Sequence, residues 1–364
     1  MIKKNISSST YDIRIEKLQL LLDEKNIDAI LIEKASNIFY LTGYYSTSET
    51  EREVLLLVTK THAFLIIHPL RSFNSPTSVC TVLQAEKGDF YTTLFANIPA
   101  QKRLYFEQSI RYDQFSYLKK HAKTIAPLPT QGIVEGLRTI KDTYELSVLK
   151  YADRATREVL QSFLKKLSTH KTEQQAALNL KQQLEQKTKE NVAFAPIVAS
   201  GRHSAIPHHT PRMSKISDIT IVDCGAKYKG YCADITRTVH KDAKKSDRLR
   251  IIHAVEEAYN ASYSQIRAGM KSKDAFLIAF DILKKYNLHT FFIHSLGHGV
   301  GIDIHELPHL SPASNEILMS GMVFSLEPGV YIPGQFGVRY ENTVVLTDKG
   351  CIELHARDEN LYTV

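Results

Sequence analysis

The sequence predicts an α+β protein in which a small α/β domain is followed by a larger α+β domain. Its 364 residues exceed the size of one ordinary domain, so two domains are expected. In the first third, short apolar runs alternate with segments of helical spacing, which is the pattern of an α/β domain. The remainder begins with helical patterns and ends in apolar runs separated by glycine turns, which indicates hairpins.

The predicted N-terminal domain spans residues 1–125. Its expected elements are a helix over 11–25, a strand over 29–33, a hairpin of strands 54–58 and 63–67, a strand over 104–106 and a helix over 112–123. Pro127, Pro129 and Gly132 then give residues 126–139 the composition of a domain boundary, so a linker is expected there.

The predicted catalytic domain spans residues 140–364. Helical spacing predicts helices over 142–167, 173–190, 246–266 and 272–286, and apolar runs predict strands over 194–200 and 219–223. Thr143 is the expected cap of the first helix because Glu145 and an apolar pattern follow it.

Two aspartates form the first acidic pair of this domain. Asp223 ends an apolar strand, and Asp223 and Asp234 lie equally far from a turn between Tyr228 and Lys229. If the stretch folds as a hairpin, the two carboxylates lie opposite each other on one face. A single Asp at a strand end is usually a turn former, but opposed like charges are destabilising unless a positive group lies between them.

Two glutamates form the second acidic pair. Glu327 and Glu341 lie equally far from Gly334, so a second hairpin would again place two carboxylates opposite each other. Glu341 stands among valines in mid-strand, where an unpaired charge costs several kcal/mol. Arg339, on the same strand face, is the structural alternative as its salt-bridge partner.

A glycine-rich stretch contributes three histidines, His294, His298 and His305, within twelve positions. Its alternating glycines are Gly297, Gly299 and Gly301. Glycine lets the backbone approach a ligand closely, but the stretch lacks the phosphate-loop lysine, a GxGxxG motif and a following Rossmann helix. Together with the two acidic pairs, His298 gives one imidazole and four carboxylates, which suit two divalent cations better than a structural zinc ion.

Composition limits the classes of partner. Hydrophobic content is 43%, charged content is 23%, and the net charge of +7 is dispersed along the chain, so we expect no nucleic-acid binding. No apolar run reaches the ~20 residues of a membrane span. The polar N-terminus and four cysteines without a CxxC pair predict reduced thiols and a cytoplasmic protein.

These motifs resemble the pita-bread metallopeptidases, which include methionine aminopeptidase, aminopeptidase P and prolidase. The resemblance covers roughly residues 140–355. The Xaa-Pro branch fits better than methionine aminopeptidase, on segments 197–201, 231–238 and 297–306 and on Asn37–Gly43, which resembles a creatinase-type N-terminal domain. The resemblance therefore implies a creatinase-like N-terminal domain and a pita-bread catalytic domain.

The resemblance also implies roles. Asp223 looks like the chelating ligand of one metal, Asp234 and Glu341 like bridging carboxylates, and His298 and Glu327 like the ligands that complete the second metal. Mn²⁺ is the first candidate for the two divalent ions, with Co²⁺, Zn²⁺ and Fe²⁺ as alternatives. The implied activity is hydrolysis of the bond before a proline in the second position of a peptide, by a homodimer.

The remaining implied roles concern the substrate. Glu327 would also carry the proton from nucleophile to leaving amine, while His208 and His305 would stabilise the tetrahedral intermediate or orient the peptide. His294 would line the proline pocket, and Arg339 would hold a metal-site carboxylate. The chain departs from the usual family pattern at His209, Ser295 and Leu296, which could alter the pocket.

Two alternatives remain at this point. A pita-bread domain that has lost catalysis could bind peptides or proteins, and a creatinase-like relative could work without metal. Both are disfavoured because all five ligand positions carry coordinating side chains. The sequence does not separate a dipeptidase from an aminopeptidase that takes longer peptides.

Overall fold

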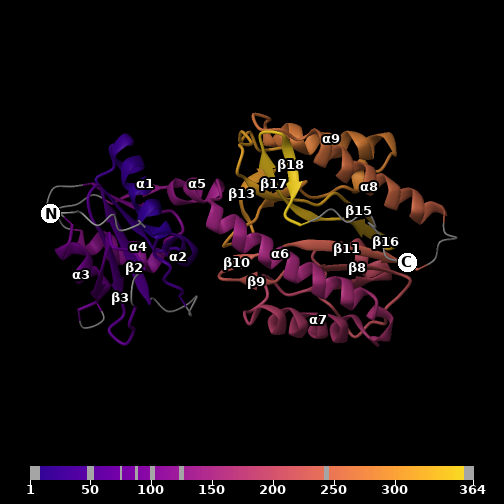
Figure 1. Cartoon of the computed structure of the whole chain (residues 1–364), viewed down its shortest axis with the longest axis horizontal. Helices are drawn as coiled ribbons and strands as arrows, with labels where there is room; N and C mark the ends of the chain where they lie inside the picture. Colours follow the sequence, from indigo (N-terminus) through magenta and orange to yellow (C-terminus); the bar gives the residue numbers. More distant parts are fainter. Residues whose placement is uncertain are drawn as a thin grey trace, which may run out of the picture. The chain divides into compact units, whose positions relative to one another are not determined.

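The chain divides into two compact units, Met1–Arg138 and Thr139–Val364 (Figure 1). The computed structural model describes residues 9–46, 53–73, 76–86, 89–98, 103–122, 127–241 and 246–355. None of the helices in these ranges combines the length and apolar composition that a membrane crossing requires. The two units have separate hydrophobic cores.

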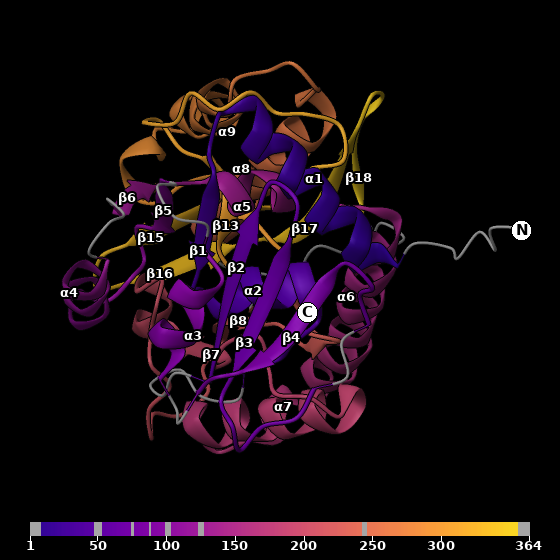
Figure 2. The same cartoon turned by 90° about the vertical axis from the view of Figure 1, so that its left-hand side faces the viewer.

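The N-terminal unit is built on one six-stranded sheet in the order β4-β3-β2-β1-β5-β6 (Figure 2). Its strands are β1 (Ala29–Ile32), β2 (Val54–Thr59), β3 (Ala63–Ile67), β4 (Cys80–Gln84), β5 (Leu104–Glu107) and β6 (Pro127–Thr130). Its helices are α1 (Thr10–Glu24), α2 (Ala35–Thr42), α3 (Phe90–Ala96), α4 (Tyr112–His121) and α5 (Ile133–Thr139). The mixed sheet with its covering helices confirms the predicted α/β domain.

The core of this unit explains why its strands lack polar alternation. Every residue of β2 is buried, so both faces of the strand are covered. Leu55 and Leu57 belong to the core cluster that includes Leu94 of α3 and Leu118 of α4, while α1 packs against α2 and β2. The β2–β3 hairpin has the predicted strands, joined across 59–62.

The segment expected to be a linker is folded. Within 126–139, Pro127 and Pro129 lie on β6, which pairs in parallel with β5 at the edge of the sheet, and α5 follows. Residue 126 lies outside the described residues. Proline is tolerated on an edge strand because its missing N–H faces away from the ladder. The proline content therefore marked a sheet edge rather than an extended connection.

The described residues of the C-terminal unit form four long helices and several small sheets. Its helices are α6 (Thr143–Leu164), α7 (Glu173–Thr188), α8 (Ser246–Gln265) and α9 (Ser272–Lys285), with 3₁₀ turns η1 (Leu167–Thr169), η2 (Gly201–Ala205) and η3 (His289–Phe291). Its strands are β7 (Ile197–Ser200), β8 (Ile219–Cys224), β9 (Lys227–Tyr228), β10 (Tyr231–Cys232), β11 (Ile235–His240), β12 (Gly297–Gly299), β13 (Glu306–Leu310), β14 (Val323–Leu326), β15 (Gly329–Ile332), β16 (Phe336–Arg339), β17 (Asn342–Thr347) and β18 (Gly350–Glu353).

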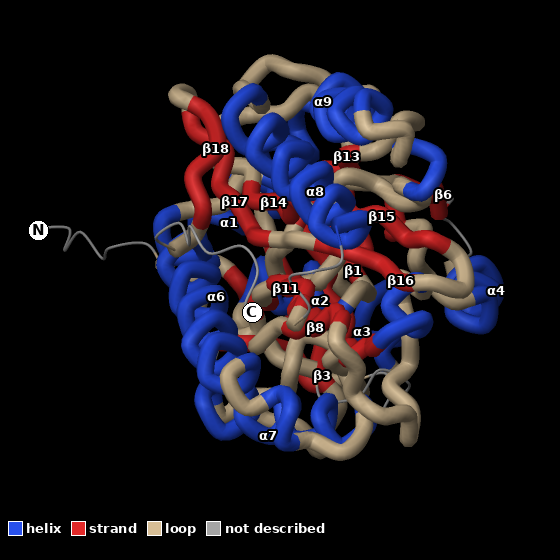
Figure 3. Tube along the Cα trace, turned by 90° about the vertical axis from the view of Figure 1, so that its right-hand side faces the viewer, coloured by secondary structure: helices blue, strands red, loops and turns tan. Residues whose placement is uncertain are grey.

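Helices cover these strands from two sides (Figure 3). One core cluster joins α6 and α7 to the sheet β11-β8-β7. A second cluster joins α8 and α9 to the sheet β13-β12-β14-β17-β18 and to the β15–β16 hairpin. Strands β8, β11 and β14 are buried along their whole length, so any polar side chain on them needs a partner.

The cap of α6 differs from the prediction by one residue. Asp142, not Thr143, is the N-cap, and its carboxylate accepts the backbone N–H of Glu145 at 2.8 Å. The Glu145 carboxylate in turn accepts the N–H of Asp142 at 3.0 Å, which completes a capping box. The helix starts where predicted because this box satisfies two otherwise unpaired backbone donors.

The register of the first acidic hairpin also differs from the prediction. Asp223 lies opposite Thr236, and Asp234 is two positions away from that partner. The turn is centred on Lys229 and Gly230, whose φ values of 47° and 79° are those of a type I′ turn. The two aspartates are therefore diagonal neighbours on one face rather than directly opposed.

The second acidic hairpin has the predicted register. Leu326 lies opposite Asn342 and Gly329 opposite Arg339, so the positions between them place Glu327 opposite Glu341. Both carboxylates stand where one strand pair ends and the next begins. Glu327 and Glu341 therefore lie between the β14–β17 pairing and the β15–β16 pairing, on one face of the hairpin.

Candidate metal centre

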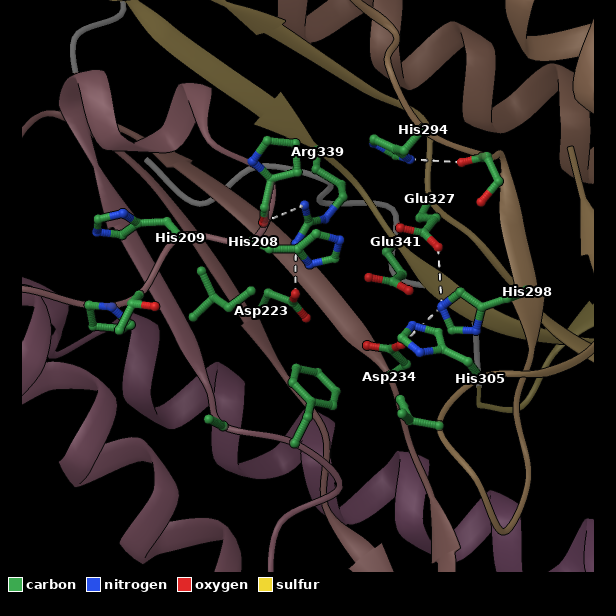
Figure 4. A pocket seen from close by; sticks show the side chains of 18 of the residues that line it. His208, His209, Asp223, Asp234, His294, His298, His305, Glu327, Arg339 and Glu341 are labelled. Carbon is green, nitrogen blue, oxygen red and sulfur yellow. Dashed lines mark hydrogen bonds and ion pairs between the residues drawn. The ribbon is translucent and has the colours of Figure 1, made fainter. Parts of the chain in front are cut away.

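The five predicted ligand residues line one cavity of about 460 Å³ in the C-terminal unit (Figure 4). They are Asp223 on β8, Asp234 before β11, His298 on β12, Glu327 after β14 and Glu341 before β17. Residues more than a hundred positions apart thus meet because the two sheets and the β15–β16 hairpin surround this cavity. The predicted substrate residues His208, His294, His305 and Arg339 line it too.

Three of these side chains form a tight group. Asp234, His298 and Glu341 each offer a ligand atom, and these atoms lie within 4.8 Å of one another. His298 Nε2 lies 3.6 Å from Asp234 Oδ2 and 3.3 Å from Glu327 Oε1. One imidazole thus faces two carboxylates at a spacing that a shared cation could bridge.

Burial dominates the electrostatics of the acids. It raises the pKa of Asp223, raises that of Asp234 well above its ordinary value, and raises that of Glu341 to about 8, and neighbouring carboxylates add to all three shifts. Like charges in a dry site cannot all ionise without a positive partner. Glu341, whose pKa is about 8, therefore holds a proton in the metal-free protein at neutral pH, and the raised pKa of Asp234 favours its protonated form as well.

The pKa values of Glu327 and His298 shift in the direction that favours the charged form of each group. Burial opposes ionisation of both groups, but their mutual hydrogen bond and charge attraction exceed it. The pKa of Glu327 falls to about 2, and that of His298 rises to about 9. In the metal-free protein this pair is therefore an imidazolium next to a carboxylate, and His298 must lose a proton before it can coordinate a cation.

The donor set fits divalent cations. Among the described residues, two buried carboxylate oxygens at the cavity, Asp223 Oδ1 and Glu341 Oε1, have no hydrogen-bond partner. Such an orphaned acceptor is costly unless an ion or water completes it. Four carboxylates and one imidazole are also the ligands that hard or borderline cations prefer.

Arg339 forms its salt bridge with Asp223 rather than with Glu341. Its guanidinium donates to Asp223 Oδ2 at 2.6 Å, to Thr236 Oγ1 at 3.0 Å and to the Tyr331 hydroxyl at 2.9 Å. The alternative of an Arg339–Glu341 salt bridge is not what the structure contains. Arg339 orients one oxygen of Asp223 and leaves the other facing the cavity.

The three auxiliary histidines differ in their surroundings. His294 Nε2 hydrogen-bonds the Tyr331 hydroxyl at 2.9 Å, and its Nδ1 lies 2.7 Å from the Ser295 carbonyl. The His305 ring lies 4.2 Å from the His298 ring, edge to face. Burial lowers the pKa of both His294 and His305, so each is neutral at pH 7. His208 lies on an exposed loop position.

The glycines of the histidine stretch act differently from the prediction. A Cβ on Gly297 would lie 1.9 Å from the Ser325 carbonyl oxygen, and one on Gly299 would lie 2.1 Å from that of Leu307. The absent side chains let neighbouring strands approach, rather than letting the backbone meet a ligand. They position His298 through the sheet.

Of the three positions predicted to depart from the family pattern, two line the cavity. These are His209 and Ser295. Leu296 is fully buried in the core with α8 and α9, and its carbonyl accepts the Glu327 N–H at 2.8 Å. Leu296 therefore supports the backbone of a candidate ligand and does not shape the pocket surface.

Sequence reasoning missed several cavity residues. His309 lines the cavity because β12 and β13 place it opposite His298, and no local pattern marks that pairing. Tyr331 was missed as the link between His294 and Arg339. Phe194, Ile197 and Ile304 supply apolar lining that could have been suspected only from the register.

Comparison with known proteins agrees with this architecture. The model of Metallopeptidase family M24 matches residues 147–348, and that of the Creatinase/Prolidase N-terminal domain matches residues 14–140. An Xaa-Pro dipeptidase of Pyrococcus furiosus is 30% identical over 96% of this chain and 99% of its own length.

Solved structures give the same result. The Xaa-Pro dipeptidase from Bacillus anthracis superposes with a TM-score of 0.88 at 29% identity, covering 97% of this chain and 99% of that one. The X-Pro aminopeptidase from Thermotoga maritima gives 0.83 at 27% identity, covering 96% and 100%. With a family match over most of the C-terminal unit and relatives aligned from end to end, this chain belongs to Metallopeptidase family M24.

Proposed function

We propose that this protein is a dinuclear metal-dependent exopeptidase that hydrolyses the Xaa-Pro bond at the N-terminus of dipeptides. The observation that carries the proposal is the buried set of four carboxylates and one imidazole around a single cavity, with two acid oxygens that have no protein partner. The relatives named Xaa-Pro dipeptidase support the substrate class.

The ligand roles follow the sequence-based assignment. Asp223 would bind one cation, Asp234 and Glu341 would bridge, and His298 with Glu327 would complete the second position. Two bound divalent ions lower the pKa of a shared water and polarise the scissile carbonyl. The five side chains would hold these ions, and Arg339 keeps Asp223 oriented through its 2.6 Å bond.

The other roles belong to proton transfer and substrate orientation. Glu327, whose carboxylate stays ionised, accepts a proton and returns it to the leaving proline nitrogen. His305, neutral at pH 7, and His208 donate hydrogen bonds to the oxygen that becomes negative in the tetrahedral intermediate. His294, held by Tyr331, lines the side of the cavity that receives the proline ring.

Three finer points belong to the same proposal. Mn²⁺ is the metal we propose first, ahead of Co²⁺, Zn²⁺ and Fe²⁺, because the set is rich in oxygen donors. We also propose a homodimer, to be checked by light scattering. A cytoplasmic location is supported by the four cysteines, all buried with free thiols.

The test uses the full chain, stripped of metal and then reloaded with Mn²⁺. Hydrolysis of alanyl-proline should appear on reloading, at about two metal equivalents, and should exceed that of a longer Ala-Pro peptide. Alanyl-alanine is the control for proline selectivity. Faster cleavage of the longer peptide would replace the dipeptidase by an aminopeptidase. Activity without metal would favour a creatinase-like hydrolase, and metal binding without turnover would favour a peptide-binding module.

A further inference from the structure

A second polar cluster lies next to the cavity and involves none of the five candidate ligands. Glu173, the first residue of α7, is fully buried. Its Oε1 lies 2.8 Å from His203 Nδ1, and its Oε2 lies 2.9 Å from His209 Nε2. The two imidazole rings stack at 4.6 Å. We call these three residues the Glu173 cluster.

The Glu173 carboxylate also binds two backbone amides. The N–H of Ser200 donates to Oε1 at 2.8 Å, and the N–H of Arg212 donates to Oε2 at 3.1 Å. With the two histidines, this gives four donors for one carboxylate, which fills its four lone-pair positions. A cation could enter only by displacing hydrogen bonds that already satisfy the group, so the cluster works as a set of hydrogen bonds.

These bonds fix both ends of one segment. Ser200 and Arg212 stand at the two ends of this segment, residues 200–212, which we call the loop. The N–H of Gln174 on α7 donates to the Arg212 carbonyl at 2.9 Å. Within the loop, the carbonyl of Pro207 lies 3.4 Å from Arg339 Nη1 in the candidate metal centre. The loop is therefore held to α7 on one side and to the centre on the other.

His208 lies between these fixed points. It is exposed, whereas its neighbour His209 is only 3% exposed. In Figure 4, His208 lies next to Asp223 at the acidic centre, and His209 lies to the left, away from it. An exposed side chain on a loop has no packing of its own to restrict it, so its position depends on the backbone of its neighbours.

We propose that the Glu173 cluster positions His208 over the metal centre, with Glu173 and His209 as positioning residues for the Xaa-Pro hydrolysis proposed above, on which this inference rests. The cluster acts on His208 through the backbone of the loop. Its loss moves His208 while leaving the five candidate ligands in place.

The test uses a matched pair of variants at position 209. In His209→Gln, the amide nitrogen stands close to the place of His Nε2 and can still donate to Glu173. In His209→Leu, a side chain of similar size removes the donor. We expect His209→Leu to lower kcat about 10- to 100-fold, since small misplacement of a reacting group has effects of this order. KM should change little, and His209→Gln should restore most of the loss.

A second readout does not depend on turnover. Hydrogen–deuterium exchange should show faster exchange over residues 200–212 in His209→Leu and Glu173→Gln, with residues 219–224 unchanged. Glu145→Gln is the control for removing a buried carboxylate from the first turn of a helix, since Glu145 does not line the cavity. It should leave both the exchange of 200–212 and kcat unchanged.

The outcomes are distinct. If the unmodified enzyme cleaves no Xaa-Pro peptide, the proposed function fails, and the exchange data alone decide whether the cluster holds the loop. Normal exchange and normal kcat in His209→Leu would overturn the positioning role. Loss of one metal equivalent in His203→Ala or His209→Leu would also overturn the positioning role, because it would show that the cluster is a third metal site.

Discussion

Metal binding at pH 7 should release at least two protons, one from Glu341 and one from His298, and Asp234, whose pKa is raised well above its ordinary value, should add to the release. In the metal-free protein the pKa of Glu341 is about 8 and that of His298 about 9, both raised from 4.5 and 6.5. At pH 7 both groups are therefore mainly protonated. Coordination needs both groups deprotonated, so the protons must leave when metal binds. Glu327, with a pKa of about 2, contributes none.

The assay is titration calorimetry of Mn²⁺ into metal-free protein, in buffers with different ionisation enthalpies. The slope of apparent enthalpy against buffer enthalpy gives the number of protons released. It should fall as pH rises through the pKa values of Glu341 and His298, and Glu341→Gln should lower it by about one at pH 7. Glu107→Gln is the matched control, because Glu107 is a buried carboxyl of the N-terminal unit whose pKa is about 7. A slope near zero at pH 7 would refute the reasoning.

Three further outcomes follow from named contacts. Arg339→Leu leaves the buried Asp223 carboxylate unpaired and should destabilise the metal-free protein by about 3–5 kcal/mol in urea denaturation, with part of the loss recovered by Mn²⁺. Glu327→Gln should lower kcat about 10²- to 10⁴-fold in steady-state assays while thermal unfolding shows an intact fold. Leu56→Ala, at a fully buried position of β2, should cost about 2–5 kcal/mol by calorimetry without changing metal stoichiometry.

The candidate ligands could be predicted because each acid stands in an apolar run. A carboxylate among valines, as at Glu341, signals a partner wherever the strand lies. The second hairpin was also predictable, since Gly334 fixes a symmetric turn and the register follows from it. Residue type and spacing therefore predicted those ligands whose positions depend on pairing within one hairpin.

The first hairpin was misregistered for a physical reason. A type I′ turn needs positive φ at both central residues, and Lys229 adopts it although a lysine gives no sign of it. The turn was instead predicted between Tyr228 and Lys229, because that centre places the two aspartates directly opposite each other. The error did not remove Asp234 from the site, since a shift of two positions keeps a side chain on the same face.

The Glu173 cluster could not be predicted from sequence. Its bonds join residues 27 to 39 positions apart, between a helix start and a loop with no periodicity. Glu173 alone is an ordinary acid in the first turn of a helix, where its charge favours the helix dipole. Only the packing of α7 against the loop turns it into the common acceptor of four donors.

The protein itself supplies too little positive charge for its own metal centre. Four buried carboxylates face one permanent cation, Arg339, and that cation binds Asp223 alone among them. Protonated His298 offsets a second charge, and the raised pKa values of Asp234 and Glu341 show that protons offset the rest. A proton satisfies one oxygen and leaves Glu341 Oε1 without a partner, whereas a divalent cation can contact several oxygens at once. The same burial that makes these acids hold protons therefore makes them exchange those protons for metal as pH rises, so metal affinity should increase steeply through the pH range where Glu341 and His298 titrate.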